Sequence, residues 1–149
     1  MDQVDRVIYD LKNNPYSRRI MTNIYVHQDL SEMNLYPCAY SVTFNVTGNK
    51  LNAILNQRSQ DVLAANNWNV VQYAALVYMM AQVTGFEPGE LVHVIADAHI
   101  YDRHIPIVEE LISRIEYEET GQDGFSPLMK RGCFYEQFRC YNKSRAGRC

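Results

Sequence analysis

The chain has 149 residues, of which 47% are apolar and 21% are charged, and its formal net charge is −3. This length fits one domain with a buried core, and this composition excludes a chain that is disordered throughout. The charge is uneven, because residues 130–149 hold six basic side chains and one acid, so this tail is +5 and the preceding residues are −8. A basic tail on an acidic body indicates either a nucleic-acid contact or a solvated surface.

The cysteine spacing does not indicate a metal site. Cys133, Cys140 and Cys149 lie close together without a C-x-x-C pair or a nearby histidine, and Cys38 stands alone. The sequence has no charged leader followed by an apolar run, and its longest apolar window, residues 70–83, is too short to span a bilayer. We therefore expect a cytoplasmic protein with free thiols, no metal and no membrane partner.

The first third of the chain predicts a helix, a strand and a short helical turn. Asp2 is a helix cap before apolar residues at helical spacing, and Pro15 ends this helix; the apolar residues are Val4, Val7, Ile8 and Leu11. Residues 20–26 are rich in β-branched and aromatic types and predict a strand, which directly follows Arg18 and Arg19. Asp29 is expected to cap the short turn that precedes Pro37 and Cys38.

A β-hairpin is predicted from strict alternation. Tyr40, Val42, Phe44 and Val46 alternate with polar residues, and residues 50–57 return as the partner strand. Gly48 and Asn49 supply the positive-φ residues of the tight turn. Because Cys38 and Arg58 are each about ten residues from this turn, antiparallel pairing places them opposite one another.

The second half predicts a central helix, a strand and a last helix. Residues 69–84 are apolar on almost every side, which is typical of a helix buried in the centre of a domain, and Gly85 ends it. Pro88 and Gly89 are expected to turn the chain, residues 91–100 to form a strand, and residues 105–115 to form a helix. Periodicity fails beyond Glu116. We expect one α+β domain over residues 1–116 and a divergent basic tail over residues 117–149.

Several polar residues could form a site for a small anion with a polar ring. Arg58 lies where its charge could activate Cys38 as a nucleophile, although a lone cysteine is also commonly a small buried thiol. Arg58 and Ser59, joined by Arg18 and Arg19, could bind a phosphate, or these arginines could form an exposed basic patch.

Residues farther along the chain could bind a base and a sugar. The amide of Asn69 matches the O4 and N3–H edge of uracil, or it caps the central helix. His99 and Tyr101 share a strand face and could hold a sugar hydroxyl, whereas a satisfied core histidine is the alternative for His99 and for His93.

Five separated segments resemble thymidylate synthase, in family order and spacing. They read DQVDRVIYDLKNNPYSRR, DLSEMNLYPCAY, LNQRSQDVLAANNWNVVQYA, MMAQVTGFEPGELVH and DAHIYDRHI, and they cover about residues 2–115. The resemblance implies a thymidylate synthase-like mixed sheet with a buried central helix. It also implies reductive methylation of dUMP to dTMP with 5,10-methylenetetrahydrofolate as cosubstrate.

The resemblance assigns roles to particular residues. Cys38 matches the nucleophile that adds to C6 of the uracil, and Arg58 and Asn69 complete the expected catalytic set. The expected dUMP contacts are Arg18, Arg19, Arg58, Ser59, Gln60, Asp61, Asn69, His99 and Tyr101. Asp61 also matches the acid that holds the folate pterin. Arg18 and Arg19 match a pair that reaches the phosphate in the other subunit of a homodimer, so a homodimer is expected.

The chain also departs from the family pattern. Ala39 stands where many members have histidine after the nucleophile, and Asn67 and Trp68 replace Pro-Phe. Relative to a full-length synthase the chain resembles a copy that is incomplete at both ends, for which weak or no turnover is expected. The alternatives are a non-catalytic nucleotide- or RNA-binding remnant that uses its basic tail, and an unstable fragment without function.

Overall fold

The computed structural model describes residues 1–120, with side chains described as far as Arg114. The chain divides into two units, residues 1–105 and 106–149, and the described part of the second belongs to helix α3 (Ile105–Thr120). The expected basic tail begins within this helix, and its cysteines and basic side chains lie outside the described residues. The boundary at residue 116 and an RNA contact of the tail therefore stay predictions.

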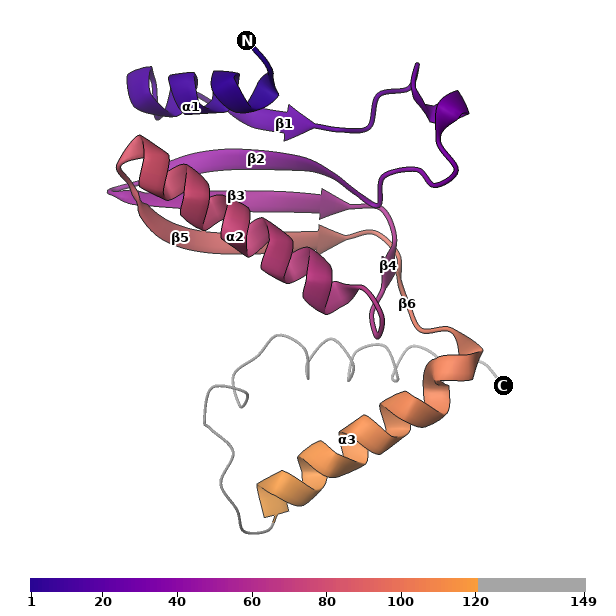
Figure 1. Ribbon diagram of the computed structural model, residues 1–149. Coiled ribbons are helices and arrows are strands. Elements are labelled where there is room, and N and C mark those ends of the chain that lie inside the picture. The colour runs from indigo at the N-terminus through magenta and orange to yellow at the C-terminus, as the bar shows by residue number, and fades with distance from the viewer. Residues whose placement is uncertain (121–149) are drawn as a thin grey trace. The chain divides into compact units, whose positions relative to one another are not determined.

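The first unit is built on a mixed four-stranded sheet, as predicted (Figure 1). Its strands are β1 (Met21–Asn23), β2 (Ala39–Thr47), β3 (Lys50–Gln57) and β5 (Glu87–Ile95), in the order β1-β2-β3-β5. The pairs β1–β2 and β2–β3 are antiparallel, and β3–β5 is parallel. Two short strands, β4 (Gln60–Asp61) and β6 (Ala98–His99), pair in parallel beyond the main sheet. The α+β fold class is thus confirmed.

The predicted hairpin forms in the expected register. Thr47 pairs with Lys50, and Gly48 has a φ of 62°, a backbone angle that residues with a β-carbon rarely adopt. At the far end, the backbone N–H of Arg58 donates to the carbonyl of Cys38 over 2.9 Å. The alternation of the sequence and the turn together therefore determine which residues meet at the open end of the hairpin.

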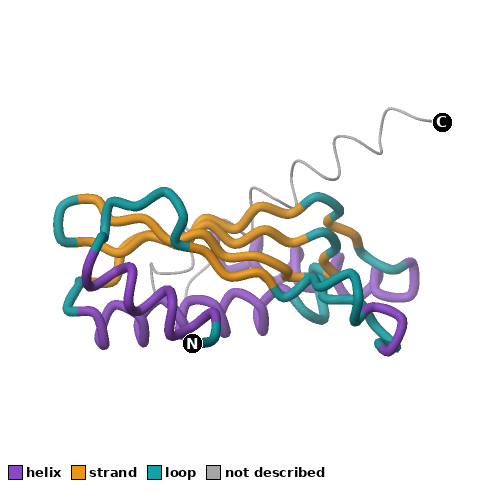
Figure 2. The backbone as a smooth tube through the Cα atoms, turned by 90° about the horizontal axis from the view of Figure 1, so that it is seen from above, coloured by secondary structure: helices purple, strands orange, loops and turns teal. Residues whose placement is uncertain are grey.

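Helices α1 (Gln3–Asn13) and α2 (Asn66–Thr84) cover one face of the sheet (Figure 2). The core beneath these helices is apolar; it includes Val7, Leu11, Val42, Phe44, Leu51, Ala53, Leu55, Val77, Met80 and Ala81. Alternation sends the intervening residues to the other face, among them Thr43, Asn52, Ile54, Asn56, Val92 and Val94. Neither helix of the first unit covers this second face, which we call the open sheet face.

The central helix differs from the prediction in how it starts and in how much of it is buried. It begins at Asn66 rather than at residue 69, and it ends as expected at Gly85, whose φ is 82°. Only its sheet side is buried, whereas Tyr78 is 65% exposed and Met79 is 58% exposed. An apolar helix needs neighbours on every side to be fully buried, and the sheet and α1 supply them on one side only.

Two strand predictions were inaccurate. The first strand contains only Met21–Asn23, because its hydrogen bonds to β2 end near Ser41. Pro88 and Gly89 do not turn the chain but lie inside β5, where the edge position tolerates a proline. A β-carbon at residue 89 would overlap Oδ1 of Asn52 and lie 2.8 Å from the carbonyl oxygen of Leu51. Gly89 therefore permits the close approach of β5 to β3.

None of the helices within residues 1–120 is long and apolar enough to cross a bilayer.

Candidate functional site

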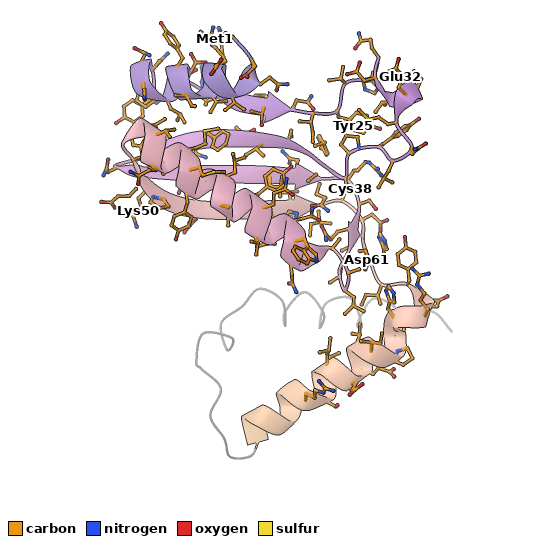
Figure 3. All side chains as sticks on the ribbon, viewed as in Figure 1. Met1, Tyr25, Glu32, Cys38, Lys50 and Asp61 are labelled. Atoms are coloured by element: carbon orange, nitrogen blue, oxygen red, sulfur yellow. The ribbon has the colours of Figure 1, made fainter. Side chains whose placement is uncertain are left out.

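The predicted site residues gather where β2 begins and β3 ends. Figure 3 places Cys38 and Asp61 at the same end of the sheet, opposite the hairpin residue Lys50. The hairpin positions Cys38 beside Arg58, and the segment after β3 adds Ser59, Gln60 and Asp61. Asn69 joins this group from the first turns of α2.

Arg58 is held by backbone carbonyls and faces the thiol. Its Nε donates to the carbonyl of Pro37 over 3.0 Å, and its Nη2 donates to the carbonyl of Tyr36 over 2.7 Å. The same Nη2 lies 3.9 Å from Sγ of Cys38. Nη1 has no hydrogen-bond partner among the described residues, so two N–H groups stay available to an anion. The guanidinium can thus contact both the thiol and a ligand.

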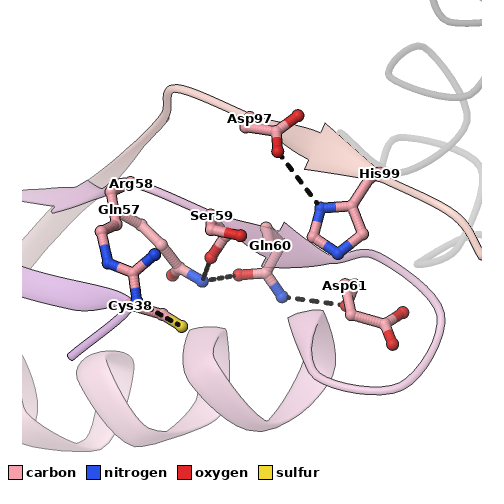
Figure 4. Close-up of polar contacts among 8 residues, drawn as sticks. All are labelled: Cys38, Gln57, Arg58, Ser59, Gln60, Asp61, Asp97 and His99. Atoms are coloured by element: carbon pink, nitrogen blue, oxygen red, sulfur yellow. Dashed lines mark hydrogen bonds and ion pairs between the residues drawn. The ribbon is translucent and has the colours of Figure 1, made fainter. Parts of the chain in front are cut away.

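Behind the thiol lies a cluster of side-chain amides (Figure 4). Nε2 of Gln57 donates to the carbonyl of Ser59 over 2.8 Å and to Oε1 of Gln60. Gln57 is 2% exposed and Gln60 is 1% exposed, so their polar groups depend on partners within the protein. Only the carbonyl of Ser59 is engaged in this cluster, which leaves its half-buried hydroxyl for a ligand.

Asn69 lies in the helix and does not cap it, contrary to one prediction. Ala65 is the N-cap residue, and the backbone N–H of Asn69 donates to the carbonyl of Ala65 over 3.0 Å. The side chain of Asn69 points to the amide cluster, where its Oδ1 accepts from Nε2 of Gln57 over 3.3 Å. The helix begins one turn earlier than predicted, and this shift turns the asparagine from a cap into a lining residue.

Asp61 has a local structural role that the sequence did not single out. Its Oδ1 accepts from the backbone N–H of Ala64 over 3.1 Å, and its carbonyl accepts from the N–H of Ala65. Asp61 therefore stabilises the turn that leads into α2. Its second carboxylate oxygen is free of this turn and can accept a hydrogen bond from a ligand.

His99 and Tyr101 contact one another, although they do not share a strand as predicted, because β5 ends at Ile95 and β6 ends at His99. Their rings pack edge to face with centroids 5.1 Å apart, and Arg103 lies 5.3 Å from the centre of the Tyr101 ring. Nδ1 of His99 is buried and lies 3.6 Å from the carboxylate of Asp97, beyond hydrogen-bond reach. This histidine thus has an unpaired polar atom among the described residues, next to the short strand that carries Asp61.

The structure does not bring Arg18 and Arg19 to the rest of the site. The carbonyl of Ile20 accepts from the backbone N–H of Phe44, six residues along β2 from Cys38. Six strand residues span about 20 Å, which is farther than an arginine side chain reaches. Both arginines are exposed. They therefore cannot meet the same ligand as Arg58 within one chain.

Two members of the site, Gln57 and His93, were not among the predicted site residues. Nε2 of His93 lies 2.8 Å from Oε1 of Gln57, and burial lowers the pKa of His93. His93 was weighed only as a core histidine, because a lone histidine on a strand carries no motif. The sequence did offer one indication, which is the alternation of the strand. Residues 91, 93 and 95 lie on the helix-covered face of β5, so the side chain of His93 points toward the interior.

Among the described residues, no group of three or more histidine, cysteine or acidic side chains is placed to hold a metal ion. Cys38 is a free thiol.

Comparison with known proteins gives a consistent result. A family model described as thymidylate synthase matches residues 1–122. Thymidylate synthase of Bacillus subtilis subsp. natto is 42% identical over 118 residues, which are 79% of this chain and 42% of that protein. Thymidylate synthase of Clostridium beijerinckii is 46% identical over 104 residues, which are 70% of this chain and 40% of that protein.

A solved structure shows the same likeness. The thermostable thymidylate synthase A from Bacillus subtilis matches with a TM-score of 0.74 and 38% identity, over 85% of this chain and 42% of that one. The chain therefore spans about two fifths of the length of these relatives.

Proposed function

The chain belongs to the thymidylate synthase family, and on this basis we propose that it binds dUMP and uses Cys38 to activate the uracil for methylation. The observation that carries the proposal lies at the end of β3, where Arg58 is 3.9 Å from the sulfur of Cys38 and the preceding residue, Gln57, contacts the amide of Asn69. Cys38, Arg58 and Asn69 supply a nucleophile, a fixed positive charge and a planar amide. The chemistry needs all three within the reach of one nucleotide.

The polar groups at the site suit the three parts of dUMP. Nη1 of Arg58 and the hydroxyl of Ser59 bind the phosphate, because a guanidinium and a hydroxyl both donate to phosphate oxygens. Gln60 lies between these residues and Asp61 and supports this wall of the site. Asn69 binds the uracil edge, and His99 with Tyr101 holds the deoxyribose.

In this proposal, Cys38 adds to the base as a thiolate. Its sulfur forms a bond to C6 of the uracil, and the electrons of the C5–C6 double bond move to C5 and O4 as an enolate. C5 then takes up the one-carbon unit and loses its hydrogen as a proton, after which the bond between sulfur and C6 breaks. Arg58 keeps a positive charge beside the sulfur, where it stabilises the attacking and the departing thiolate.

The reduced folate, 5,10-methylenetetrahydrofolate, supplies the one-carbon unit and the hydride that completes dTMP. We assign its binding to Asp61, because one carboxylate oxygen holds the turn before α2 and the other can accept from a pterin N–H. The hydrogen bond from Ala64 fixes the direction of this carboxylate before the ligand arrives.

We further propose a homodimer that forms through the open sheet face. This face combines exposed Val92 and Val94 with asparagines, and it lies opposite the helix-covered core. A two-fold axis on such a face makes it pair with itself. The homodimer also gives Arg18 and Arg19 a ligand. The phosphate site of their own chain is about 20 Å away, so we propose that they bind the phosphate held by the partner subunit.

The first test of this function is tritium release from dUMP that carries tritium at C5, measured with methylenetetrahydrofolate. We expect weak or no tritium release from the unmodified chain. Where release is detectable, we expect Cys38→Ser to lower it by about a hundredfold or more, because a hydroxyl is a far weaker nucleophile at neutral pH. Calorimetric titration with dUMP is the control, and Cys38→Ser should bind as the unmodified chain does.

Where the unmodified chain releases tritium, equal release from Cys38→Ser would exclude Cys38 as the nucleophile. Absence of dUMP binding in the unmodified chain would contradict the nucleotide site itself.

A further inference from the structure

Asparagine alone does not distinguish uracil from cytosine. Uracil offers an acceptor at O4 and a donor at N3, whereas cytosine offers a donor at N4 and an acceptor at N3. An asparagine amide pairs with the first edge in one orientation and with the second after a half-turn about its last bond. Discrimination by Asn69 therefore requires something that fixes the orientation of its amide.

Two backbone carbonyls determine the direction of the neighbouring amides. A carbonyl oxygen only accepts, so the group of Gln57 that faces the carbonyl of Ser59 must be the NH₂. In the same way, Nε2 of Gln60 donates to the carbonyl of Asp61 over 3.2 Å, which turns Oε1 of Gln60 toward Gln57. Neither glutamine can reverse without setting two acceptors or two donors against one another.

Asn69 stands at the end of this chain of hydrogen bonds. The NH₂ of Gln57 faces it and shares its two hydrogens among three acceptors, of which Oδ1 of Asn69 is the most distant, at 3.3 Å. Nδ2 of Asn69 is then the amide atom that does not face Gln57. A reversed Asn69 would bring its own NH₂ against that of Gln57. The observed orientation leaves Nδ2 free to donate and leaves Oδ1 a second lone pair, which is the pattern that uracil needs.

His93 holds the opposite end of Gln57. Oε1 of Gln57 lies 2.8 Å from Nε2 of His93, so this ring nitrogen must carry the proton. Burial lowers the pKa of His93, and the neutral ring then has its single proton on Nε2. His93 thus completes the set of partners that the buried Gln57 needs to stay in one orientation.

We propose that His93 and Gln57 are positioning residues that hold the amide of Asn69 in the orientation for uracil and thereby exclude dCMP. This inference rests on the proposed dUMP site. It concerns selectivity rather than chemistry, because neither side chain contacts the reacting atoms. Its distinctive consequence is that changes on β5, outside the nucleotide contacts, alter the choice between two bases.

The test compares His93→Phe with His93→Gln in the full chain. Phenylalanine keeps the ring and removes the donor, whereas glutamine places an NH₂ where Nε2 stood. Calorimetric titration with dUMP and with dCMP gives the affinity ratio for each protein. We expect this ratio to fall about tenfold in His93→Phe, equivalent to about 1.4 kcal/mol, and to stay within about twofold of the unmodified value in His93→Gln.

Deoxyribose 5-phosphate, which lacks a base, is the control ligand. Its affinity should be the same for all three proteins if His93 acts only on base choice. An unchanged ratio of dUMP to dCMP affinity in His93→Phe would overturn the inference while the dUMP site itself stood. Equal losses of affinity for all three ligands would also overturn it, because they would show a general structural role.

A second measurement needs no ligand, and it uses a variant only to assign one signal. The nitrogen NMR shifts of the imidazoles in the unmodified chain report which ring nitrogen carries the proton, and His93→Gln identifies the signal of His93. A neutral His93 protonated on Nε2 supports the network. Protonation on Nδ1 alone would overturn it, whatever the outcome for dUMP binding.

Discussion

At the scale of single residues, His93 links the stability of the fold to pH. It is a half-buried side chain beside Gln57, and burial lowers its pKa below the ordinary value of 6.5. Between these two pKa values the unfolded chain binds more protons than the folded one, so stability rises with pH through this range. The contribution is complete above pH 6.5 and is lost as pH falls through the pKa of the folded protein.

The pH dependence of His93→Gln checks this sign. We expect the urea midpoint of the unmodified chain to fall more steeply below pH 6.5 than that of His93→Gln, because glutamine does not titrate. His27→Gln is the matched control, since His27 is an exposed histidine that contacts the ring of Tyr25. Parallel profiles for the unmodified chain and His93→Gln would contradict the expected coupling.

At the scale of elements, α1 is joined to the sheet by polar contacts at its start. The side chain of Asp2 accepts from the backbone N–H of Asp5 over 2.9 Å. Gln3 then exchanges two hydrogen bonds with the backbone of Asn23, in which its Nε2 donates over 2.9 Å and its Oε1 accepts over 2.7 Å. The side chain of Gln3 therefore pairs with the edge strand β1 as a strand backbone would.

Removal of the Asp2 cap tests how much the start of α1 contributes to the free energy of unfolding. We expect Asp2→Ala to lower the free energy of unfolding by about 1 kcal/mol, because one helix N–H loses its acceptor. Asp2→Asn should stay close to the unmodified chain, since asparagine caps equally well. Urea denaturation followed by circular dichroism measures both. Equal stability of the alanine and asparagine variants would show that this cap does not limit the stability of the fold.

At the scale of the whole molecule, the open sheet face is the feature to test. Val94 lies on this face and is 48% exposed. In the proposed homodimer, Val94→Lys sets two positive charges into the shared interface, and we expect the protein to sediment as a monomer. Val4→Lys is the matched control, because Val4 is 46% exposed on α1 and does not lie on this face.

Sedimentation velocity of both variants and of the unmodified chain separates the outcomes. A monomeric unmodified chain, or equal masses for Val94→Lys and Val4→Lys, would contradict a dimer through the open sheet face. Inorganic phosphate binding that weakens in Val94→Lys would further support a contribution of Arg18 and Arg19 across the interface.

Much of the site follows from local pattern. Alternation and the Gly48 turn predict the hairpin, and the register of a two-residue hairpin then determines which residues meet at its open end. The meeting of Cys38 and Arg58 was predicted in this way. The capped α1 and the end of α2 at Gly85 were likewise predicted, because caps and positive-φ residues act within a few positions of the chain.

Other features lay beyond local pattern. Residues 66, 67 and 69 are asparagines, a type that favours N-cap positions, whereas the observed N-cap residue is Ala65. The start of α2 was therefore predicted one turn late, and Asn69 was interpreted as a possible cap. Pro88 and Gly89 indicated a turn, but the backbone of β3 pairs with this segment and keeps it extended. The exposed side of α2 also differed from the prediction, because exposure depends on which neighbours are present.

The sequence by itself determined the family, the hairpin and the chemical types gathered at its end, since these depend on short spacings and on residue identity. Only the tertiary structure decided that Gln57, Asn69 and His93 form one cluster and that Arg18 and Arg19 stand apart from it. The physical reason is that a buried amide takes its orientation from partners on other elements. Those partners, on α2 and β5, lie 12 and 36 residues from Gln57 along the chain.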